Sequence, residues 1–424
     1  MVLTEQGYKA RLMDGLIDEL LEAFGAISIE GPKFCGKTWI ALNHAQSVFY
    51  AMDPEGNFAN RQLAQLNPSK VIQGESPRLI DEWQVAPGLW DAVRFSIDRQ
   101  PHKGRFLLTG STAPVAEKPL HSGTGRIARI YLRPLTLFES GESSGAIQLH
   151  TLFDEQALEP TASSSDLEAL ANLCVKGGWP ENQDTPDNRA ARMPTHYLEA
   201  IYTSDISSPD GIARDPKKVA ALLRALARNN ATMVSNTSLK QDVSQREGML
   251  SAPTLASYLE SLKRIFILEE LPGWAPDIRS KRRSRTSPKR YLVDPSLTVA
   301  ALGASAERLL VDMPTFGQVF EGLCVRDLLV YCSLFDATLH HYHDESGLEV
   351  DAIIERRNGD FGAVEIKLNA GHENLAAASL TKFQAKMRSA GARTPSFLLI
   401  ITGGGLAYQR DDGVFVVPIT CLRN

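Results

Sequence analysis

Short apolar runs alternate with helical patterns over the first 150 residues. Each run is bounded by polar or glycine residues, which is typical of a strand buried on both faces. The runs that we predict to be strands are residues 25–30, 47–52, 78–81, 105–109 and 126–131. Strands that alternate with helices favour a parallel sheet, so we expect an α/β domain here.

Apolar residues three and four positions apart predict helices over residues 216–270. The two apolar stripes consist of Val219, Leu222, Leu223 and Leu226, and of Leu255, Tyr258, Leu259, Leu262 and Ile265. A short helix over 239–243 is expected between them, and a strand pair follows at 266–271 and 290–293. Three short helices followed by a strand pair is the order of a winged helix, which we predict for this middle region.

The last hundred residues again mix helices and strands, which predicts a third unit, also α/β. Its expected elements are a helix over 316–335, strands at 340–342, 349–355, 362–367, 396–401 and 414–417, and a helix over 375–388. Residues 141–170 are rich in Gly, Ser, Ala and Glu and have weak periodicity, which indicates a boundary or a loosely ordered connector. The predicted segments are 1–140, 141–215, 216–310 and 311–424.

Composition excludes several classes of protein. The 424 residues are too many for one ordinary domain, and 43% hydrophobic with 22% charged residues fits a folded globular chain. A net charge of −5 means that contact with nucleic acid would require a local basic patch. The 5 cysteines are odd in number and lack a CxxC pair, so neither a disulfide framework nor a zinc cluster is expected. Without a leader or membrane segment, we expect a soluble, cytoplasmic protein.

Residues 31–38 read Gly-Pro-Lys-Phe-Cys-Gly-Lys-Thr and match the complete GxxxxGK[ST] phosphate-loop pattern. The loop follows a predicted strand and precedes a helical stretch that starts at Trp39, which is the context that the pattern requires. Its glycines let successive backbone N–H groups turn towards an anion, and a helix N-terminus adds positive charge. The predicted nucleotide-binding residues are Gly31, Pro32, Lys33, Phe34, Cys35, Gly36, Lys37 and Thr38.

Within this loop, we expect Lys37 to reach the β and γ phosphates of ATP and the Thr38 hydroxyl to coordinate Mg²⁺. Asp81 and Glu82 end an apolar strand and supply the carboxylates that nucleotide hydrolysis also needs. We predict that Asp81 holds Mg²⁺ through its water shell and that Glu82 acts as general base or positions water.

Hydroxyls and arginines further along the chain are additional candidates. Thr109 and Ser111 end the next strand, where they are suited to contact the γ-phosphate or the attacking water, or else merely terminate the strand. Arg126 follows a flexible Ser-Gly-Thr-Gly stretch and is predicted to act as an arginine finger in a neighbouring subunit. Arg129 competes for this role, and either could be a surface arginine. A finger supplied in trans implies a homo-oligomer.

An ordered series of motifs resembles the bacterial and archaeal AAA-type ATPases that carry a C-terminal domain of unknown function. The series comprises the loop, residues 79–84, 108–111, 125–126, 133–135, 177–180, 205–206, 291–294, 320–322 and 349–351. Lys33 stands where the family usually has an arginine, which leaves the phosphate chemistry intact. The resemblance implies ATP binding more firmly than any biological role.

Asp351 lies on one predicted strand of the last unit, and Glu365 and Lys367 lie on the next. Glu365 follows Asp351 by 14 positions, which is the D…ExK spacing of restriction-endonuclease-like domains. Asp351 and Glu365 could hold a divalent metal ion while Lys367 offsets transition-state charge, and Glu321 is a candidate extra ligand. The alternatives are a metal-dependent nuclease and a nuclease-like fold retained for binding or assembly.

Basic residues gather between the two predicted middle strands. They are Arg279, Lys281, Arg282, Arg283, Arg285, Lys289 and Arg290, where a wing would follow a phosphate backbone. We weigh a nucleic-acid contact, DNA before RNA, against a solvated hairpin tip. His340, His341 and His343 alternate along one strand, so we expect surface histidines and not a metal cluster.

The sequence therefore predicts a parallel-sheet P-loop NTPase domain of AAA type, a winged-helix middle region and a restriction-endonuclease-like α/β end. The predicted function is Mg²⁺-dependent ATP hydrolysis coupled to a nucleic-acid-linked or remodelling task. The alternatives are a nucleotide-dependent binding switch with little turnover and an ATP-controlled, metal-dependent nuclease.

Overall fold

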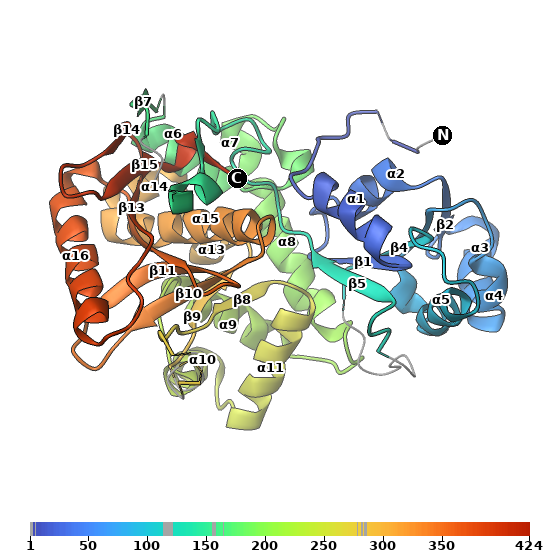
Figure 1. The fold of residues 1–424 in the computed structure, drawn as a ribbon. Helices are drawn as coiled ribbons and strands as arrows, with labels where there is room; N and C mark the ends of the chain where they lie inside the picture. Colours follow the sequence, from blue (N-terminus) through green and yellow to red (C-terminus); the bar gives the residue numbers. More distant parts are fainter. Residues whose placement is uncertain are drawn as a thin grey trace. The chain divides into compact units, whose positions relative to one another are not determined.

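The computed structural model describes residues 3–4, 6–112, 122–154, 158–163, 165–277, 279–280, 283 and 286–424 (Figure 1). The chain divides into two compact units, each assembled from separate stretches of sequence. Unit 1 consists of Met1–Pro134, Thr203–Arg214 and Tyr258–Ile267, and unit 2 consists of Leu135–Tyr202, Asp215–Ser257 and Leu268–Asn424.

Unit 1 is built on a parallel five-stranded sheet with the order β2-β3-β4-β1-β5. The strands are β1 (Ala26–Glu30), β2 (Ser47–Tyr50), β3 (Arg78–Asp81), β4 (Phe106–Gly110) and β5 (Ile127–Tyr131). The predicted parallel sheet is confirmed, with each strand within a few residues of its expected position. Because β4 lies between β1 and β3, the loops that follow these three strands meet at one edge.

Helices cover both faces of this sheet. They are α1 (Asp14–Ala23), α2 (Lys37–His44), α3 (Glu55–Leu66), α4 (Pro68–Val71) and α5 (Gly88–Arg99), with a 3₁₀ turn η1 (Trp83–Val85). Helices α1 and α2 contact β1, whereas α3, α4 and α5 contact one another. A core that includes Trp83, Trp90 and Phe106 joins these last helices to the sheet.

Unit 2 contains a mixed seven-stranded sheet with the order β10-β11-β12-β13-β15-β14-β7. Its C-terminal strands are β10 (Ala337–His343), β11 (Glu349–Arg356), β12 (Phe361–Lys367), β13 (Phe397–Thr402), β14 (Leu406–Gln409) and β15 (Phe415–Pro418). Helix α15 (Met313–Ser333) packs against β10 and β12, and α16 (Glu373–Ser389) packs along β11, β12 and β13 (Figure 1). Strands stand at all five predicted positions, and β14 is an addition.

The boundary or loosely ordered connector predicted over residues 141–170 contains regular structure among its described residues. This stretch contains β6 (Ile147–Gln148), η2 (Leu149–Asp154), β7 (Thr161–Ala162) and the start of α6 (Leu167–Lys176). Strand β7 pairs with β14, and β6 pairs with β16 (Leu422–Arg423) near the end of the chain. Two-residue strands are too short to produce a hydrophobic period, so only their distant partners reveal them.

Helices stand over residues 216–270 as expected, and further helical elements precede them. They are η3 (Pro180–Asn182), α7 (Asp187–Ala190), α8 (Arg192–Thr203), α9 (Pro216–Arg228), α10 (Asn236–Glu247) and α11 (Ala252–Arg264). Asp215 and Ser235 begin α9 and α10 by accepting a hydrogen bond from a first-turn backbone N–H, as N-cap residues do. An antiparallel hairpin of β8 (Leu268–Leu271) and β9 (Lys289–Leu292) comes next, then α13 (Pro295–Leu302) and α14 (Ala306–Val311).

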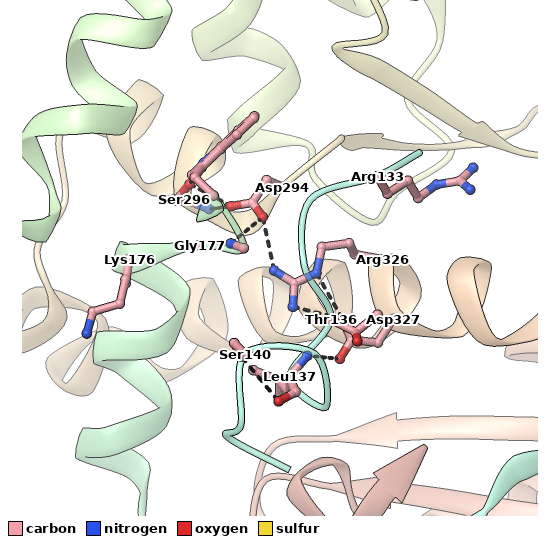
Figure 2. A network of polar contacts seen from close by, with 12 residues as sticks. Arg133, Thr136, Leu137, Ser140, Lys176, Gly177, Asp294, Ser296, Arg326 and Asp327 are labelled. Atoms are coloured by element: carbon pink, nitrogen blue, oxygen red, sulfur yellow. Dashed lines mark hydrogen bonds and ion pairs between the residues drawn. The ribbon is translucent and has the colours of Figure 1, made fainter. Parts of the chain in front are cut away.

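A buried network of charges joins four distant segments of unit 2 (Figure 2). Arg326 of α15 is 3% exposed. Its Nε and Nη2 atoms lie 2.9 and 2.7 Å from Asp327 Oδ1, and its Nη1 lies 3.0 Å from Asp294 Oδ2. A guanidinium with two carboxylates in fixed geometry is the kind of pair that survives burial, because its hydrogen bonds replace those of water.

Backbone and hydroxyl donors occupy the remaining oxygens of the two carboxylates. Asp327 Oδ2 accepts from the Leu137 amide at 2.9 Å, and Asp294 Oδ2 accepts from the Gly178 amide at 2.9 Å. Asp294 Oδ1 accepts from the Ser296 hydroxyl at 2.6 Å. The motifs at 177–180 and 291–294, to which the sequence assigned no chemistry, therefore contribute to one structural joint.

Removing the guanidinium from this joint should destabilise unit 2. We expect Arg326→Met to lower the free energy of unfolding by about 3–5 kcal/mol, because Asp294 and Asp327 would remain buried without their cation. Urea unfolding followed by circular dichroism measures the loss. The control is Arg393→Met, since the Arg393–Asp360 pair is at the surface and should contribute about 0–1 kcal/mol. Equal losses in the two variants would refute the assignment.

The same joint predicts a pH dependence. Burial raises the pKa of Asp327 to about 6, although Arg326 opposes this rise. An unfolded aspartate titrates near about pH 4. Between about pH 4 and 6 the native chain therefore binds a proton at Asp327 that the unfolded chain has lost. The contribution of Asp327 to stability decreases as pH rises through this window. In Asp327→Asn the slope of the unfolding free energy against pH should become shallower by up to about 1.4 kcal/mol per pH unit. Unfolding of both proteins from pH 4 to 7 tests this, and parallel pH curves would contradict it.

Candidate functional site

The loop between β1 and α2 has the backbone shape of an anion cradle. A Cβ atom at Gly31 would lie 2.2 Å from the Leu132 carbonyl oxygen, so this position cannot hold a larger residue without rearrangement. Gly36 has φ of 98°, which favours glycine, and α2 begins at the next residue, Lys37. Glycine is thus required at position 31 by the close approach of the Leu132 carbonyl and at position 36 by the left-handed backbone.

Arg11 holds the outside of the loop, although its sequence context gave no sign of this role. Its side chain is buried and donates to the Cys35 carbonyl at 2.9 Å and to the Arg133 carbonyl at 2.8 Å. The Cys35 thiol also donates to the Leu132 carbonyl at 3.3 Å, and burial raises its pKa. Cys35 therefore supports the loop from behind, and its thiol is not a reactive group.

Two other loop side chains have different surroundings. Lys37 is buried and donates from Nζ to the Pro32 carbonyl at 2.7 Å, so its ammonium lies over the loop. Phe34 is 60% exposed and has φ of 61°, which places an aromatic ring at the surface of the loop. The lysine is thus held beside the cradle by a single neutral acceptor.

The Asp81 carboxylate joins the loop to the ends of β3 and β4. Asp81 Oδ1 accepts hydrogen bonds from the Thr38 and Thr109 hydroxyls, both at 2.7 Å. The strand order explains this contact, since β4 separates β1 from β3 and Thr109 stands at the end of β4. One carboxylate and one hydroxyl beside a phosphate loop are the donor set for Mg²⁺ bound with a nucleotide. The residues therefore fit this ion.

Glu82 and Ser111 lie together next to Asp81. The Glu82 backbone is left-handed, with φ of 57°, and its amide is 3.2 Å from the Thr109 hydroxyl. Glu82 Oε2 accepts from the Ser111 hydroxyl at 3.3 Å and from the Gln84 side-chain amide. The sequence identifies Gln84 only as part of a motif. Its position two residues after a candidate base is the signal that could have identified its contact with Glu82.

The candidate finger Arg126 is engaged within unit 1. Its Nε lies 2.8 Å from Asp98 of α5, and its side chain is half-exposed. Arg129 lies over the Trp90 ring at 4.8 Å and 3.5 Å from Glu30. Arg126 also donates to the Thr124 carbonyl, and its role in a neighbouring subunit stays a prediction.

A distant segment of the chain reaches the phosphate loop. The Lys33 ammonium lies 2.8 Å from Asp205 Oδ1, in the 3₁₀ turn η4 (Asp205–Ser207). Arg214 closes this segment by pairing with Asp210 at 2.6 Å. Both Lys33 and Asp205 belong to unit 1, so a carboxylate from near residue 205 adds negative charge to the edge of the anion cradle.

The D…ExK residues of unit 2 are close together. Lys367 Nζ lies 3.1 Å from Asp351 Oδ2 and 2.7 Å from Glu365 Oε2. Glu321 joins them through Lys289, whose Nζ is 3.1 Å from Glu321 and 3.2 Å from Asp351. The structure therefore brings the four predicted nuclease residues together and adds a lysine that the sequence had assigned to a wing.

Burial and lysines set the protonation of this cluster. Burial raises the pKa of Glu321 and of Glu365 to about 7, and the neighbouring Asp351 carboxylate adds to the rise. Burial also pushes up the pKa of Asp351, but the ammonium groups of Lys289 and Lys367 hold it at about 2. Among the described residues, no group of three or more His, Cys, Asp or Glu side chains has a geometry that could hold a metal ion.

The expected basic wing needs correction at three positions. Arg283 makes a bidentate pair with Glu355 at 2.8 and 2.7 Å, and Arg290 lies 3.1 Å from Glu270. Lys289 is buried in the acidic cluster. These three side chains face carboxylates of unit 2 and not solvent, because the segment after β8 pairs with β10 through Gly273. Arg279 is exposed, and Lys281, Arg282 and Arg285 lie outside the described residues.

The expectation of three surface histidines is wrong for His341. Alternation along β10 places His341 on the buried face with Ala337 and Leu339, and the register becomes irregular between His340 and Tyr342. His341 is fully buried, and its Nε2 lies 3.0 Å from the Ser287 carbonyl. Burial lowers its pKa to about 4, so it is a neutral core histidine.

Comparisons with known proteins support the nucleotide site. Residues 23–140 match the family model of an AAA domain, whereas residues 167–308 and 316–422 match two domains of unknown function, DUF8612 and DUF4143. The N-terminal part of the chain is thus a P-loop ATPase domain, and this prediction is confirmed at that level. Among the described residues, no helix has the length and apolar content to cross a membrane.

Two curated relatives are uncharacterized proteins, Rv2008c of Mycobacterium tuberculosis and Mb2031c of Mycobacterium bovis. Each is 24% identical over 397 residues, covering 92% of this chain and 79% of the relative. A solved structure, the Walker-type ATPase PABY2304 of Pyrococcus abyssi, aligns with a TM-score of 0.44 and 16% identity over 70% of this chain and 97% of that one.

The Lys33–Asp205 pair predicts a change in nucleotide affinity. Asp205→Ala removes a negative charge from the edge of the cradle and frees the Lys33 ammonium, so we expect about threefold to tenfold tighter ATP binding, since a charge at such a site contributes about 1 kcal/mol. Titration with a fluorescent ATP analogue gives the dissociation constant.

The double variant Lys33→Ala/Asp205→Ala is the matched control. If the carboxylate acts through Lys33, then Asp205→Ala should have less effect when Lys33 is already absent. Weaker binding in the Asp205→Ala single variant would contradict the electrostatic argument.

Proposed function

We propose that this chain is a Mg²⁺-dependent ATPase that hydrolyses the γ-phosphate bond of ATP in the loop of unit 1. The observation that carries the proposal is that the Thr38 and Thr109 hydroxyls both donate to Asp81 Oδ1, with Glu82 and Ser111 alongside. A phosphate cradle, a metal-binding carboxylate and a second carboxylate for water are the parts that phosphoryl transfer to water needs.

In this mechanism the residues of the chain position ATP and the attacking water and stabilise the charge on the phosphates. The amides of the loop and the Lys37 ammonium bind the phosphates, and Lys37 moves from the Pro32 carbonyl to the more strongly attracting anion. Thr38 and Asp81 would hold Mg²⁺, which neutralises phosphate charge when bound. Glu82 orients the attacking water and accepts its proton, while Ser111 and Gln84 hold the Glu82 carboxylate in place.

We further propose that hydrolysis is coupled to a nucleic-acid-linked or remodelling task in a homo-oligomer. Arg126 would contribute to a neighbouring site after leaving Asp98. The nucleic-acid contact would rest on Arg279, Lys281, Arg282 and Arg285, since the other members of the basic segment have carboxylate partners. The competing hypothesis is a nucleotide-dependent switch with little turnover.

For the rest of the chain we propose a winged-helix middle region and a restriction-endonuclease-like end that serves binding or assembly. The order of α9, α10, α11, β8 and β9 supports the first assignment. The second is supported by helix α15, the antiparallel β10-β11-β12 and the parallel β13 that follows α16. Nuclease activity is disfavoured, because Lys289, which is not part of the motif, pairs with the candidate metal ligands Glu321 and Asp351.

The test of this function is steady-state ATP hydrolysis. We expect Glu82→Gln to lower kcat by about 10²–10⁴-fold while ATP still binds, since a general base contributes that much. Lys37→Ala should instead weaken ATP binding itself. The control is Glu19→Gln, an exposed carboxylate on α1, which should leave both quantities unchanged. Negligible turnover in both wild type and Glu82→Gln would favour the switch, and nucleotide binding unaffected by Lys37→Ala would refute the site.

A further inference from the structure

The segment Thr203–Arg214, which we call the strap, contacts the phosphate loop of unit 1. It lies between α8 and α9 in the chain and belongs to unit 1. Its Asp205 Oδ1 is 2.8 Å from Lys33 Nζ, and the Asp205 side chain is only 16% exposed. A carboxylate of the strap thus engages an ammonium of the loop to which the proposed function assigns the phosphates of ATP.

The strap also meets the loop that follows β4. The Ser208 hydroxyl lies 3.4 Å from the Thr112 hydroxyl. The residue before Thr112 is Ser111, which donates to Glu82 at 3.3 Å. The strap therefore contacts two different parts of the nucleotide site, so a single surface ion pair does not account for its position.

Arg214 makes the strap a compact turn. Its buried guanidinium pairs with both oxygens of Asp210, at 2.8 and 2.6 Å, and donates to the Ile206 carbonyl at 3.1 Å. Ile206 is 1% exposed, which anchors the backbone next to Asp205. The Ser208 hydroxyl donates to the Asp205 carbonyl at 2.7 Å. Because these contacts lie within the strap, its two points of contact with the site are mechanically coupled.

Nucleotide and strap compete for the Lys33 ammonium. A triphosphate carries more negative charge than one carboxylate, so it attracts an ammonium more strongly. Phosphate oxygens placed beside the Asp205 carboxylate would also repel it. ATP binding should therefore replace the ion pair between Lys33 and Asp205 by a contact between Lys33 and phosphate.

We propose that the strap is an autoinhibitory element that responds to nucleotide. Without nucleotide, Asp205 holds Lys33 in the place of phosphate, and ATP binding releases the strap from the phosphate loop. The inference rests on the proposed function, since it gives the regulation of the same nucleotide site. The strap follows α8 and leads into α9, which Asp215 caps, and α9 belongs to unit 2. Its release is thus a covalent route by which ATP binding reaches residues outside unit 1.

Amide hydrogen exchange of the full-length protein, measured with and without Mg²⁺ and the non-hydrolysable analogue AMP-PNP, tests this proposal. The reporters are the Ser208 and Gly211 amides, which donate to carbonyls of the strap at 3.0 and 2.8 Å. We expect saturating nucleotide to speed their exchange about twofold to fivefold, the effect of losing an exposed ion pair. Asp205→Asn should show the faster exchange without nucleotide, and nucleotide should change it no further.

Variants at Lys33 and a distant ion pair are the controls. Lys33→Arg keeps the cation and should retain the nucleotide response, whereas Lys33→Ala should lose it. Asp187→Asn removes a carboxylate that lies 2.8 Å from another ammonium, that of Lys176, and should leave the response of the strap unchanged.

Binding of AMP-PNP, measured in the same samples, separates failure of this proposal from failure of the proposed function. If the wild type binds AMP-PNP while exchange in the strap stays equal or slows, the strap proposal is overturned and the ATPase proposal stands. This arm needs no variant to fold. A nucleotide response that persists in Lys33→Ala would overturn the strap proposal as well, and a wild type that binds no nucleotide would overturn both.

Discussion

The order of strands in the parallel sheet of unit 1 is the constraint on which its chemistry depends. Since β4 stands between β1 and β3, a residue at the end of β4 can reach a carboxylate at the end of β3, which in turn meets the helix after β1. Thr109, Asp81 and Thr38 make these two contacts at 2.7 Å. An order that placed another strand between β3 and β4 would move Thr109 away from Asp81 by a further strand spacing of about 4.8 Å. Local motifs supply the groups, and topology makes them one site.

Unit 2 is organised by a different rule, which is that a buried charge must be matched. Arg326 joins four segments because Asp294, Asp327 and their backbone donors complete each other's hydrogen bonds. Lys289 does the same for β9, α15 and β11. Neither arrangement gains much from Coulomb attraction alone, since desolvation offsets it, but removal of one member leaves an unpaired charge. Such joints favour one arrangement of the segments over alternatives that would leave charges unmatched.

Elements and loops with local causes could be predicted from sequence. Buried strands in unit 1 follow from apolar runs, α9 from its apolar stripe and Asp215 cap, and the phosphate loop from glycine positions that the close approach at Gly31 requires. Features caused by distant pairing could not be predicted. The strand β7 exists because β14 lies beside it, and Arg11 supports the loop from 24 residues away. His341 is a core residue because it shares the buried face of β10 with Ala337 and Leu339.

The basic segment shows why a count of charged residues does not predict which side chains face solvent. Seven cations within residues 279–290 suggest a surface that attracts phosphate, but a cation is attracted equally to carboxylates of its own fold. β8 and β9 carry the segment alongside β10, which brings Arg283 to Glu355 and Lys289 to Asp351. Fewer cations can therefore contact an external nucleic acid than the seven counted in the sequence. Whether a run of cations faces solvent depends on the acidic residues of neighbouring elements, and two of these, Glu355 and Asp351, lie 72 and 62 positions after their partners Arg283 and Lys289.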